Sequence, residues 1–121
     1  MCGIVGILDL KGRRPIDERL LLAMNDAQHH RGPDQHGLHL EAGLGLGHRR
    51  LSIIDLGSGR QPLYNEDGSV VVVFNGEIYN FAGVREELRA AGHRFETDCD
   101  TEIIVHGWEE WGAACVDRFR G

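Results

Sequence analysis

The sequence predicts an α+β fold in which antiparallel strands pack against helices. Two observations lead to this class: strand-like and helix-like runs alternate along the 121 residues, and short turns separate many of the strands. The chain also contains no interdomain linker, repeat or low-complexity stretch, which indicates a single unit. With 41% hydrophobic and 26% charged residues, the composition suits one globular unit.

The start of the chain predicts one strand followed by one helix. Residues 2–10 form an apolar run typical of a strand with apolar residues on both faces. Pro15 and Asp17 are common helix-start residues, and apolar side chains then follow helical spacing as far as Ala27. Pro33 cannot continue a helix, so we expect the helix to end before it.

Short apolar runs separated by turn residues predict the strands in the middle of the chain. Turns are indicated by the sequence EAG at residues 41–43 and EDGS at residues 66–69. The β-branched run at residues 70–74 is typical of a strand buried on both faces. The patterns predict strands at 37–40, 44–48 and 51–56, a loop at 57–62, and a hairpin of strands 63–65 and 70–74.

The last third of the chain predicts two helices. Asn80 is a suitable N-cap for a helix over residues 81–91, which Gly92 would end. Residues 93–97 are expected to form a short strand. Asp100 or Thr101 would then cap a last helix that contains Ile104, Val105, Trp108 and Trp111.

The charge balance excludes several classes of partner. The net charge is −6, with 19 acidic and 13 basic residues, and no Lys/Arg run favours nucleic acid or an anionic membrane surface. No stretch approaches the ~20 apolar residues of a membrane span, and the start of the chain does not resemble a signal peptide. We therefore expect a cytoplasmic protein that binds neither nucleic acid nor membrane.

The cysteines and histidines do not indicate a metal site. The three cysteines are an odd number without a CxxC pair, which fits neither a zinc motif nor a disulfide framework. The seven histidines include no HExxH spacing. We expect no metal in the site and treat the histidines as surface or hydrogen-bonded residues.

Cys2 follows the initiator methionine directly, and this position has chemical consequences. Methionine before a small residue is normally removed, which would give Cys2 both a thiol and a free α-amine. A thiolate is a strong nucleophile, and α-amines titrate near pH ~7.7, so the amine can act as a general base at neutral pH. This pairing suits acyl transfer. By position alone, a buried cysteine that begins a strand is the simpler alternative.

Five further residues are candidates for binding or catalysis. The Asn75 side chain and the Gly76 backbone N–H could stabilise the oxyanion of a tetrahedral intermediate, although Asn-Gly alone usually indicates a turn. Arg50 could bind a carboxylate through two parallel hydrogen bonds. Glu77 and Asp100 lie beside turns and could bind an ammonium group, or be only a surface charge and a helix cap.

The sequence resembles the N-terminal-nucleophile glutaminase domain of class II glutamine amidotransferases, and its closest branch is similar to the glutamine-hydrolysing asparagine synthetases. Six segments in the family's order support this resemblance. They are MCGIVG at 1–6, HRGPD at 30–34, GHRRLSIID at 47–55, QPL at 61–63, FNGEIYN at 74–80 and TDCDTE at 97–102. Together they span essentially the whole chain.

The resemblance implies a role for each matching residue. Cys2 would attack the side-chain amide of L-glutamine, with its own α-amine as the base. Asn75 and Gly76 would form the oxyanion hole. In the substrate pocket, Arg50 would bind the α-carboxylate of glutamine, Glu77 and Asp100 its α-ammonium, and residues Leu51, Ile53 and Ile54 would line the same pocket. Residues 31–34 are expected to be mainly structural and close to the nucleophile.

The resemblance also implies a fold and a set of partners. The fold would be an αββα sandwich of antiparallel sheets, incomplete at its C-terminal end, with residues 1–121 as a truncated glutaminase domain. The chain lacks a pyrophosphate loop for ATP, so the synthetase domain, with its ATP and Mg, would be absent from it and no cofactor is expected in this chain. Expected partners are L-glutamine, the synthetase domain and a second copy in a homodimer.

Three alternatives stay open at this level. The ammonia could serve an acceptor other than aspartate, as it does in related amidotransferases. Another N-terminal-nucleophile hydrolase could act on a different amide, although Arg50 and Asp100 favour an amino-acid substrate. A non-catalytic truncated fragment could instead only bind glutamine or a partner chain.

Overall fold

The structure is a computed structural model that describes residues 2–12, 14–51 and 59–121. The chain divides into two compact units, and each is described by itself. The first consists of Met1–Leu56, Arg60–Pro62 and Val73–Asn75; the second consists of Gly57–Gly59, Leu63–Val72 and Gly76–Gly121. Among the described residues, none of the helices combines the length and the apolar character needed to cross a membrane.

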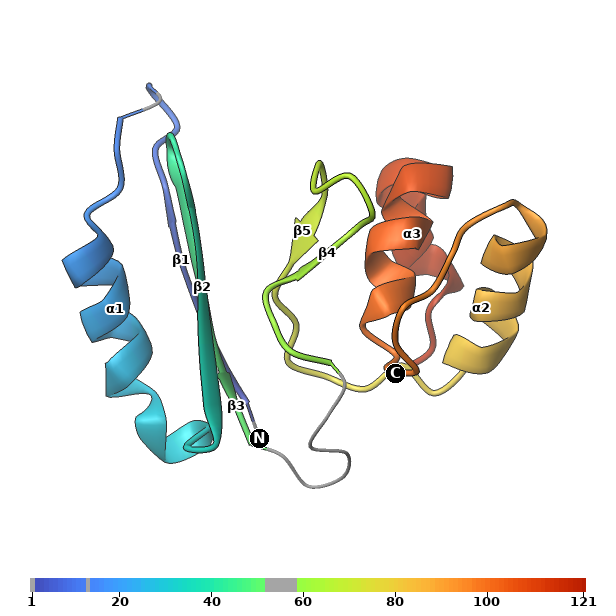
Figure 1. Ribbon diagram of the computed structural model, residues 1–121, viewed down its shortest axis with the longest axis horizontal. Coiled ribbons are helices and arrows are strands. Elements are labelled where there is room, and N and C mark those ends of the chain that lie inside the picture. Colours follow the sequence, from blue (N-terminus) through green and yellow to red (C-terminus); the bar gives the residue numbers. More distant parts are fainter. Residues whose placement is uncertain (1, 13, 52–58) are drawn as a thin grey trace. The chain divides into compact units, whose positions relative to one another are not determined.

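The first unit is a three-stranded antiparallel sheet with one α-helix on a face (Figure 1), and the 3-10 helix His29–Arg31 follows that helix. Its strands are β1 (Gly3–Leu8), β2 (Gln35–Glu41) and β3 (Leu44–Arg50), in the order β1-β3-β2. The helix α1 (Glu18–Ala27) contacts all three strands. Its Leu21 side chain is completely buried and belongs to the core of this unit.

Both ends of α1 are stabilised by side chains. As the sequence predicts, Asp17 caps the first turn, accepting hydrogen bonds from the backbone N–H groups of Arg19 at 2.9 Å and Leu20 at 3.3 Å. At the other end, Arg49 of β3 donates to the carbonyl of Asn25 at 3.1 Å and pairs with Asp26. Since a cation is favourable at a helix C-terminus, Arg49 holds α1 against the sheet.

The second unit consists of a short hairpin, two α-helices and a 3-10 helix. The hairpin strands are β4 (Leu63–Tyr64) and β5 (Val71–Val72), and both contact α3 (Glu102–Trp111). The helix α2 (Phe81–Ala90) packs on α3, which continues into the 3-10 helix Gly112–Arg118 (Figure 1). The core of this unit is formed by Leu63, Ile78, Val84, Leu88, Ile103, Val105 and Cys115.

Most of the predicted elements are confirmed with small shifts of their ends. The strands predicted at 37–40 and 44–48 are β2 and β3, and they are joined at the expected turn. The helix α2 ends where Gly92 was expected to end it, and Gly92 has the positive φ of 105° that favours glycine there. The strand predicted at 51–56 lies outside the described residues apart from Leu51.

Three predictions of local structure are wrong. Residues 93–97 form no strand, because the backbone N–H groups of Glu96 and Thr97 donate to the Glu102 carboxylate instead of to a neighbouring strand. The run at residues 70–74 is only half-buried rather than buried on both faces. Asn80 and Thr101 occupy N-cap positions, but neither side chain makes a capping hydrogen bond.

Candidate active site

Cys2 lies just before β1 and is half-buried. Its carbonyl accepts a hydrogen bond from Nε of Arg31 at 3.1 Å. Gly3, the next residue, pairs with Arg49 in the antiparallel register of β1 and β3. Cys2 and Arg50 therefore come at the same end of two neighbouring strands.

Residues 31–34 bind the ends of both of these strands. In addition to the bond from Arg31 to Cys2, the backbone N–H of Asp34 donates to the carbonyl of Arg50 at 3.1 Å. Gly32 lies so close to β3 that a Cβ there would be 2.4 Å from the carbonyl carbon of Arg49. These contacts confirm that the segment lies close to Cys2, and they are consistent with the structural role expected of it.

A pocket of about 270 Å³ opens in the first unit, and Arg50 lines it. Nη1 of Arg50 lies 3.5 Å from Oε1 of Gln35. Arg60 also lines the pocket, so two arginines border one cavity. Such a pocket is suited to an anionic group such as a carboxylate. The pocket is lined by Gln35, His36, Arg50, Arg60 and Gln61.

Asn75 is exposed, and the residue before it, Phe74, is held through both its backbone N–H and its carbonyl group. The backbone N–H of Phe74 donates to Oε1 of Gln61, and its carbonyl lies 3.2 Å from Nε2 of His48. Gln61 itself lies against β2, where a Cβ on Gly37 would be 2.1 Å from the Gln61 carbonyl oxygen. The sheet thus fixes the backbone from which the Asn75 side chain projects.

His48 makes its contact as a neutral imidazole. Burial lowers the pKa of His48 below its usual value; the bond to Phe74 raises it and the charge of Arg50 lowers it further. Because a carbonyl oxygen only accepts, the proton of the neutral ring is assigned to Nε2 from this contact. His48 is 1% exposed, so its bond to Phe74 forms away from water.

In the second unit, Asp100 holds the segment that contains Gly76 and Glu77. Oδ2 of Asp100 accepts from the backbone N–H of Ile78 at 2.7 Å. Asp100 is thus not the cap of α3, whose N-cap residue is Thr101. Gly76 and Glu77 are both exposed.

The end of the chain holds the same segment from another direction. The backbone N–H of Tyr79 donates to the carbonyl of Arg120 at 2.7 Å. The Asn80 side chain donates to the Arg118 carbonyl and accepts from the Arg120 N–H, both at 2.8 Å. These bonds explain why the Asn80 amide does not cap α2.

Asp98 and Asp100 have different surroundings in the second unit. The Asp98 side chain is 95% exposed and pairs with Nη1 of Arg85 at 3.1 Å. Asp100 is half-buried and bonds to the segment after Gly76. Of the two carboxylates, Asp100 is the better candidate for the substrate's ammonium group.

The predicted site residues divide between the two units. Cys2, Arg50 and Asn75 belong to the first unit, whereas Gly76, Glu77 and Asp100 belong to the second. Leu51 directly follows Arg50 and is half-buried, while Ile53 and Ile54 lie outside the described residues.

Three residues of the first unit were not predicted as part of the site. Arg60 lines the pocket with Arg50, and His48 and Gln61 position the peptide before Asn75. His48 and Gln61 fall inside the segments GHRRLSIID and QPL, so the sequence contained a hint of their importance. It contained no comparable hint for Arg60, which lies in a predicted loop.

Comparison with known proteins identifies similar sequences over the full length of the chain. A family model described as a glutamine amidotransferase domain matches residues 1–121. Glutamine-hydrolysing asparagine synthetase 2 of Bacillus subtilis (strain 168) is 45% identical over 123 residues, which cover 100% of this chain and 16% of that protein. The nodule asparagine synthetase of Pisum sativum is 42% identical over 121 residues, covering 100% of this chain and 20% of that protein. The chain thus spans a fifth or less of the length of these relatives.

Proposed function

The chain belongs to the glutamine amidotransferase domain family, and from this premise we propose that it hydrolyses L-glutamine to glutamate and ammonia. The observation that most supports the proposal is the hydrogen bonding by residues 31–34 in the first unit. This segment binds the carbonyls of Cys2 and Arg50, and the closeness of these two residues at one end of the sheet supports their proposed roles as nucleophile and carboxylate-binding residue. A pocket lined by two arginines includes the same Arg50.

The proposed reaction starts once Met1 has been removed. The free α-amine of Cys2 takes the thiol proton, and the thiolate attacks the side-chain amide carbon of glutamine. The Asn75 side chain and the Gly76 N–H stabilise the resulting oxyanion. The intermediate collapses with transfer of a proton to the leaving ammonia and forms a γ-glutamyl thioester on Cys2. Water then hydrolyses this thioester to glutamate and restores the thiol.

Substrate selection is proposed to rest on the charges at the backbone end of glutamine. Arg50 binds the α-carboxylate, with Arg60 beside it in the pocket. From the resemblance, Leu51, Ile53 and Ile54 are also proposed to belong to the glutamine subsite. Glu77 and Asp100 bind the α-ammonium. A site that pairs both charges rejects analogues that lack either one.

The relatives support a proposal for the fate of the ammonia. Because their names are those of glutamine-hydrolysing asparagine synthetases, we propose that the ammonia serves ATP-dependent formation of asparagine by a synthetase domain. ATP and Mg would belong to that domain. Residues 1–121 would act as its glutaminase domain, and the two antiparallel sheets would be parts of an αββα sandwich. A homodimer and a cytoplasmic location stay predictions.

Labelling with a diazo-ketone analogue of glutamine tests the proposal. Intact mass spectrometry should show loss of the Met1 mass and one stoichiometric adduct on the chain. Cys2→Ser should abolish the adduct, whereas Cys99→Ser should leave it in place as the matched control. An adduct that persists in Cys2→Ser would remove Cys2 from the proposed reaction, and a processed chain that takes up no adduct would argue against a formed site.

A further inference from the structure

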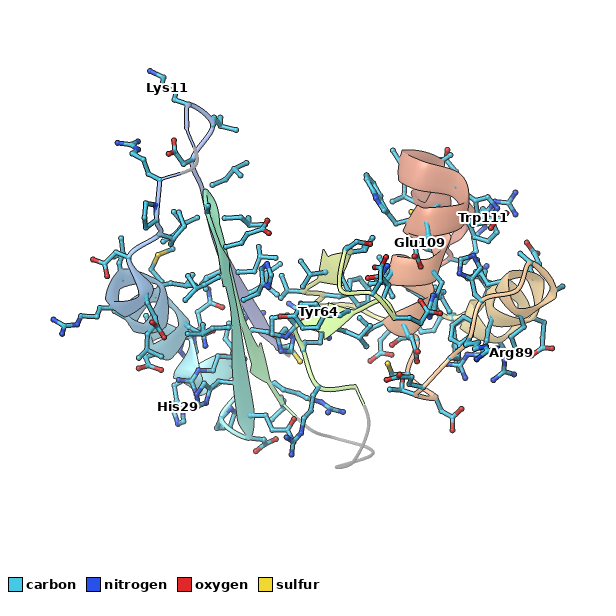
Figure 2. All side chains as sticks on the ribbon, turned by 45° about the horizontal axis from the view of Figure 1, so that its top comes forward. Lys11, His29, Tyr64, Arg89, Glu109 and Trp111 are labelled. Atoms are coloured by element: carbon cyan, nitrogen blue, oxygen red, sulfur yellow. The ribbon has the colours of Figure 1, made fainter. Side chains whose placement is uncertain are left out.

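Among the described residues, three side chains of the second unit bring nitrogen and oxygen donors within 4.8 Å of one another: His93, His106 and Glu109. Oε2 of Glu109 lies 3.4 Å from Nδ1 of His106 and 3.8 Å from Nδ1 of His93. Ligand atoms at ~2.1 Å from a tetrahedral zinc ion are roughly 3.4 Å apart. The three donors thus need only small shifts to bind one ion. Figure 2 shows the position of Glu109 on α3.

The other nitrogen of each imidazole faces a second carboxylate. Nε2 of His93 lies 3.1 Å from Oε2 of Glu110, and Nε2 of His106 lies 3.6 Å from Oε1 of Glu102. A carboxylate on the far nitrogen orients a metal-binding histidine and increases its basicity. His93 therefore has the surroundings typical of a metal ligand, whereas the buried Nε2 of His106 makes no hydrogen bond to Glu102. In both histidines, Nδ1 faces the shared oxygen of Glu109.

Glu109 is also held in place on its far side. Its Oε1 accepts a hydrogen bond from Nδ2 of Asn65 at 2.7 Å, which leaves Oε2 for the two imidazoles. A fourth ligand is available from Glu66, whose Oε2 lies 3.7 Å from Nδ1 of His106. The side chain of His106 is 2% exposed and that of Glu66 is 43% exposed, so an ion can enter from the side of Glu66.

We propose that His93, His106 and Glu109, with Glu66 as the fourth ligand, bind a divalent transition-metal ion of the zinc class. Two imidazoles with one or two carboxylates favour Zn²⁺, Co²⁺ or Ni²⁺ over Mg²⁺ and Ca²⁺, which prefer oxygen ligands alone. The ion would connect α3 to the turn after β4 and to the segment between α2 and α3. This site contains none of the residues proposed for glutamine hydrolysis.

The spacing of these residues explains why the sequence did not predict the site. His106 and Glu109 are three residues apart on α3, a spacing that puts both side chains on one face of a helix. His93 and Glu66 come from other segments, at distances along the chain that match no short metal motif. The expectation of no metal rested on the lack of HExxH and CxxC patterns.

Titration of the 121-residue chain with Co²⁺ tests the proposal. We expect visible absorption bands of four-coordinate Co²⁺ that saturate at one equivalent and disappear when Zn²⁺ displaces the cobalt. His93→Gln and Glu109→Gln should each weaken binding by at least tenfold. Two exposed positions of the first unit supply matched controls, His30→Gln and Glu41→Gln, and both should bind Co²⁺ as the wild type does.

Folding of each variant is checked by far-UV circular dichroism. His106→Gln is not used, because His106 is buried. If His93→Gln or Glu109→Gln fails to fold, Glu66→Gln takes its place, since Glu66 is exposed, and this variant should also bind Co²⁺ more weakly than the wild type does. The proposal is overturned if no stoichiometric binding occurs, if the folded variants bind as the wild type does, or if only His30→Gln weakens binding. Each of these results would mean that the two imidazoles only pair with the neighbouring carboxylates and form no metal site.

Discussion

His48 connects the sheet of the first unit to the peptide before the proposed oxyanion donor. It is 1% exposed and lies 3.2 Å from the Phe74 carbonyl. Burial is the main cause that lowers its pKa, with a smaller lowering from Arg50 and an opposing effect of the bond to Phe74. The folded state thus disfavours the imidazolium form, which the unfolded chain adopts below pH ~6.5.

This shift predicts how stability depends on pH. Where the unfolded chain binds more protons than the folded one, stability rises with pH. The contribution of His48 is therefore complete above pH ~6.5 and is lost as the pH falls from there through the lowered pKa. Urea unfolding between pH 7.5 and 5 should show this loss in the wild type and in the His30→Gln control. His48→Gln should be less stable at pH 7.5 but less sensitive to pH, and an unchanged sensitivity would contradict the assignment.

Arg50 and Arg60 line one pocket, but only Arg50 is at the end of β3 where residues 31–34 hold its backbone. Arg50→Ala should raise the KM for glutamine by about tenfold or more, since a hydrogen bond to a charged group contributes about 1.5–3 kcal/mol. Arg60→Ala should have a smaller effect because its side chain is exposed. Steady-state ammonia release measures both variants. An unchanged KM in Arg50→Ala would remove Arg50 from the substrate pocket.

At the scale of elements, local patterns were sufficient for helices and turns but not for segments fixed by distant side chains. Asp17 and Gly92 act on their own helices, so their effects were predictable from neighbouring residues. The strand expected at 93–97 fails because Glu102 takes two of its N–H groups. The choice of Cys2 rested on its position in the sequence, but its contact with Arg31 joins residues 29 apart and needs the fold.

The segment 31–34 packs closely against β3 at Gly32. A Cβ on Gly32 would lie 2.4 Å from the Arg49 carbonyl carbon and 2.6 Å from the Arg50 nitrogen, so Gly32→Ala must move the segment away from β3. We expect a loss of about 1–3 kcal/mol in stability and slower labelling of Cys2. Chemical unfolding and the rate of adduct formation measure the two effects.

Gly83 supplies the control for this change, because a Cβ there would meet nothing within 4 Å and the residue lies in α2. Gly83→Ala should be neutral or stabilising by up to about 1 kcal/mol, since alanine favours helix. Equal effects of the two alanines would show that the contact of Gly32 with β3 has no special role.

At the scale of the whole molecule, two separate cores stabilise the chain. Leu21 is completely buried in the first unit, beside the sheet that bears Cys2 and Arg50. Leu88 is completely buried in the second unit, whose helices include the metal-binding candidates His106 and Glu109. A cavity at either position removes contacts from one core, so its effect should be strongest in the unit that contains it.

Truncation of each leucine tests this division of the core. Leu21→Ala and Leu88→Ala should each cost about 2–5 kcal/mol, because the lost side-chain contacts leave a cavity. Amide hydrogen exchange should speed up most in α1 and its sheet for Leu21→Ala, and most in α2 and α3 for Leu88→Ala. If exchange instead rises equally in both units for both variants, the chain opens as one cooperative structure. Labelling of Cys2 would then depend on Leu88 as strongly as on Leu21, whereas separate opening predicts a clear loss only for Leu21→Ala.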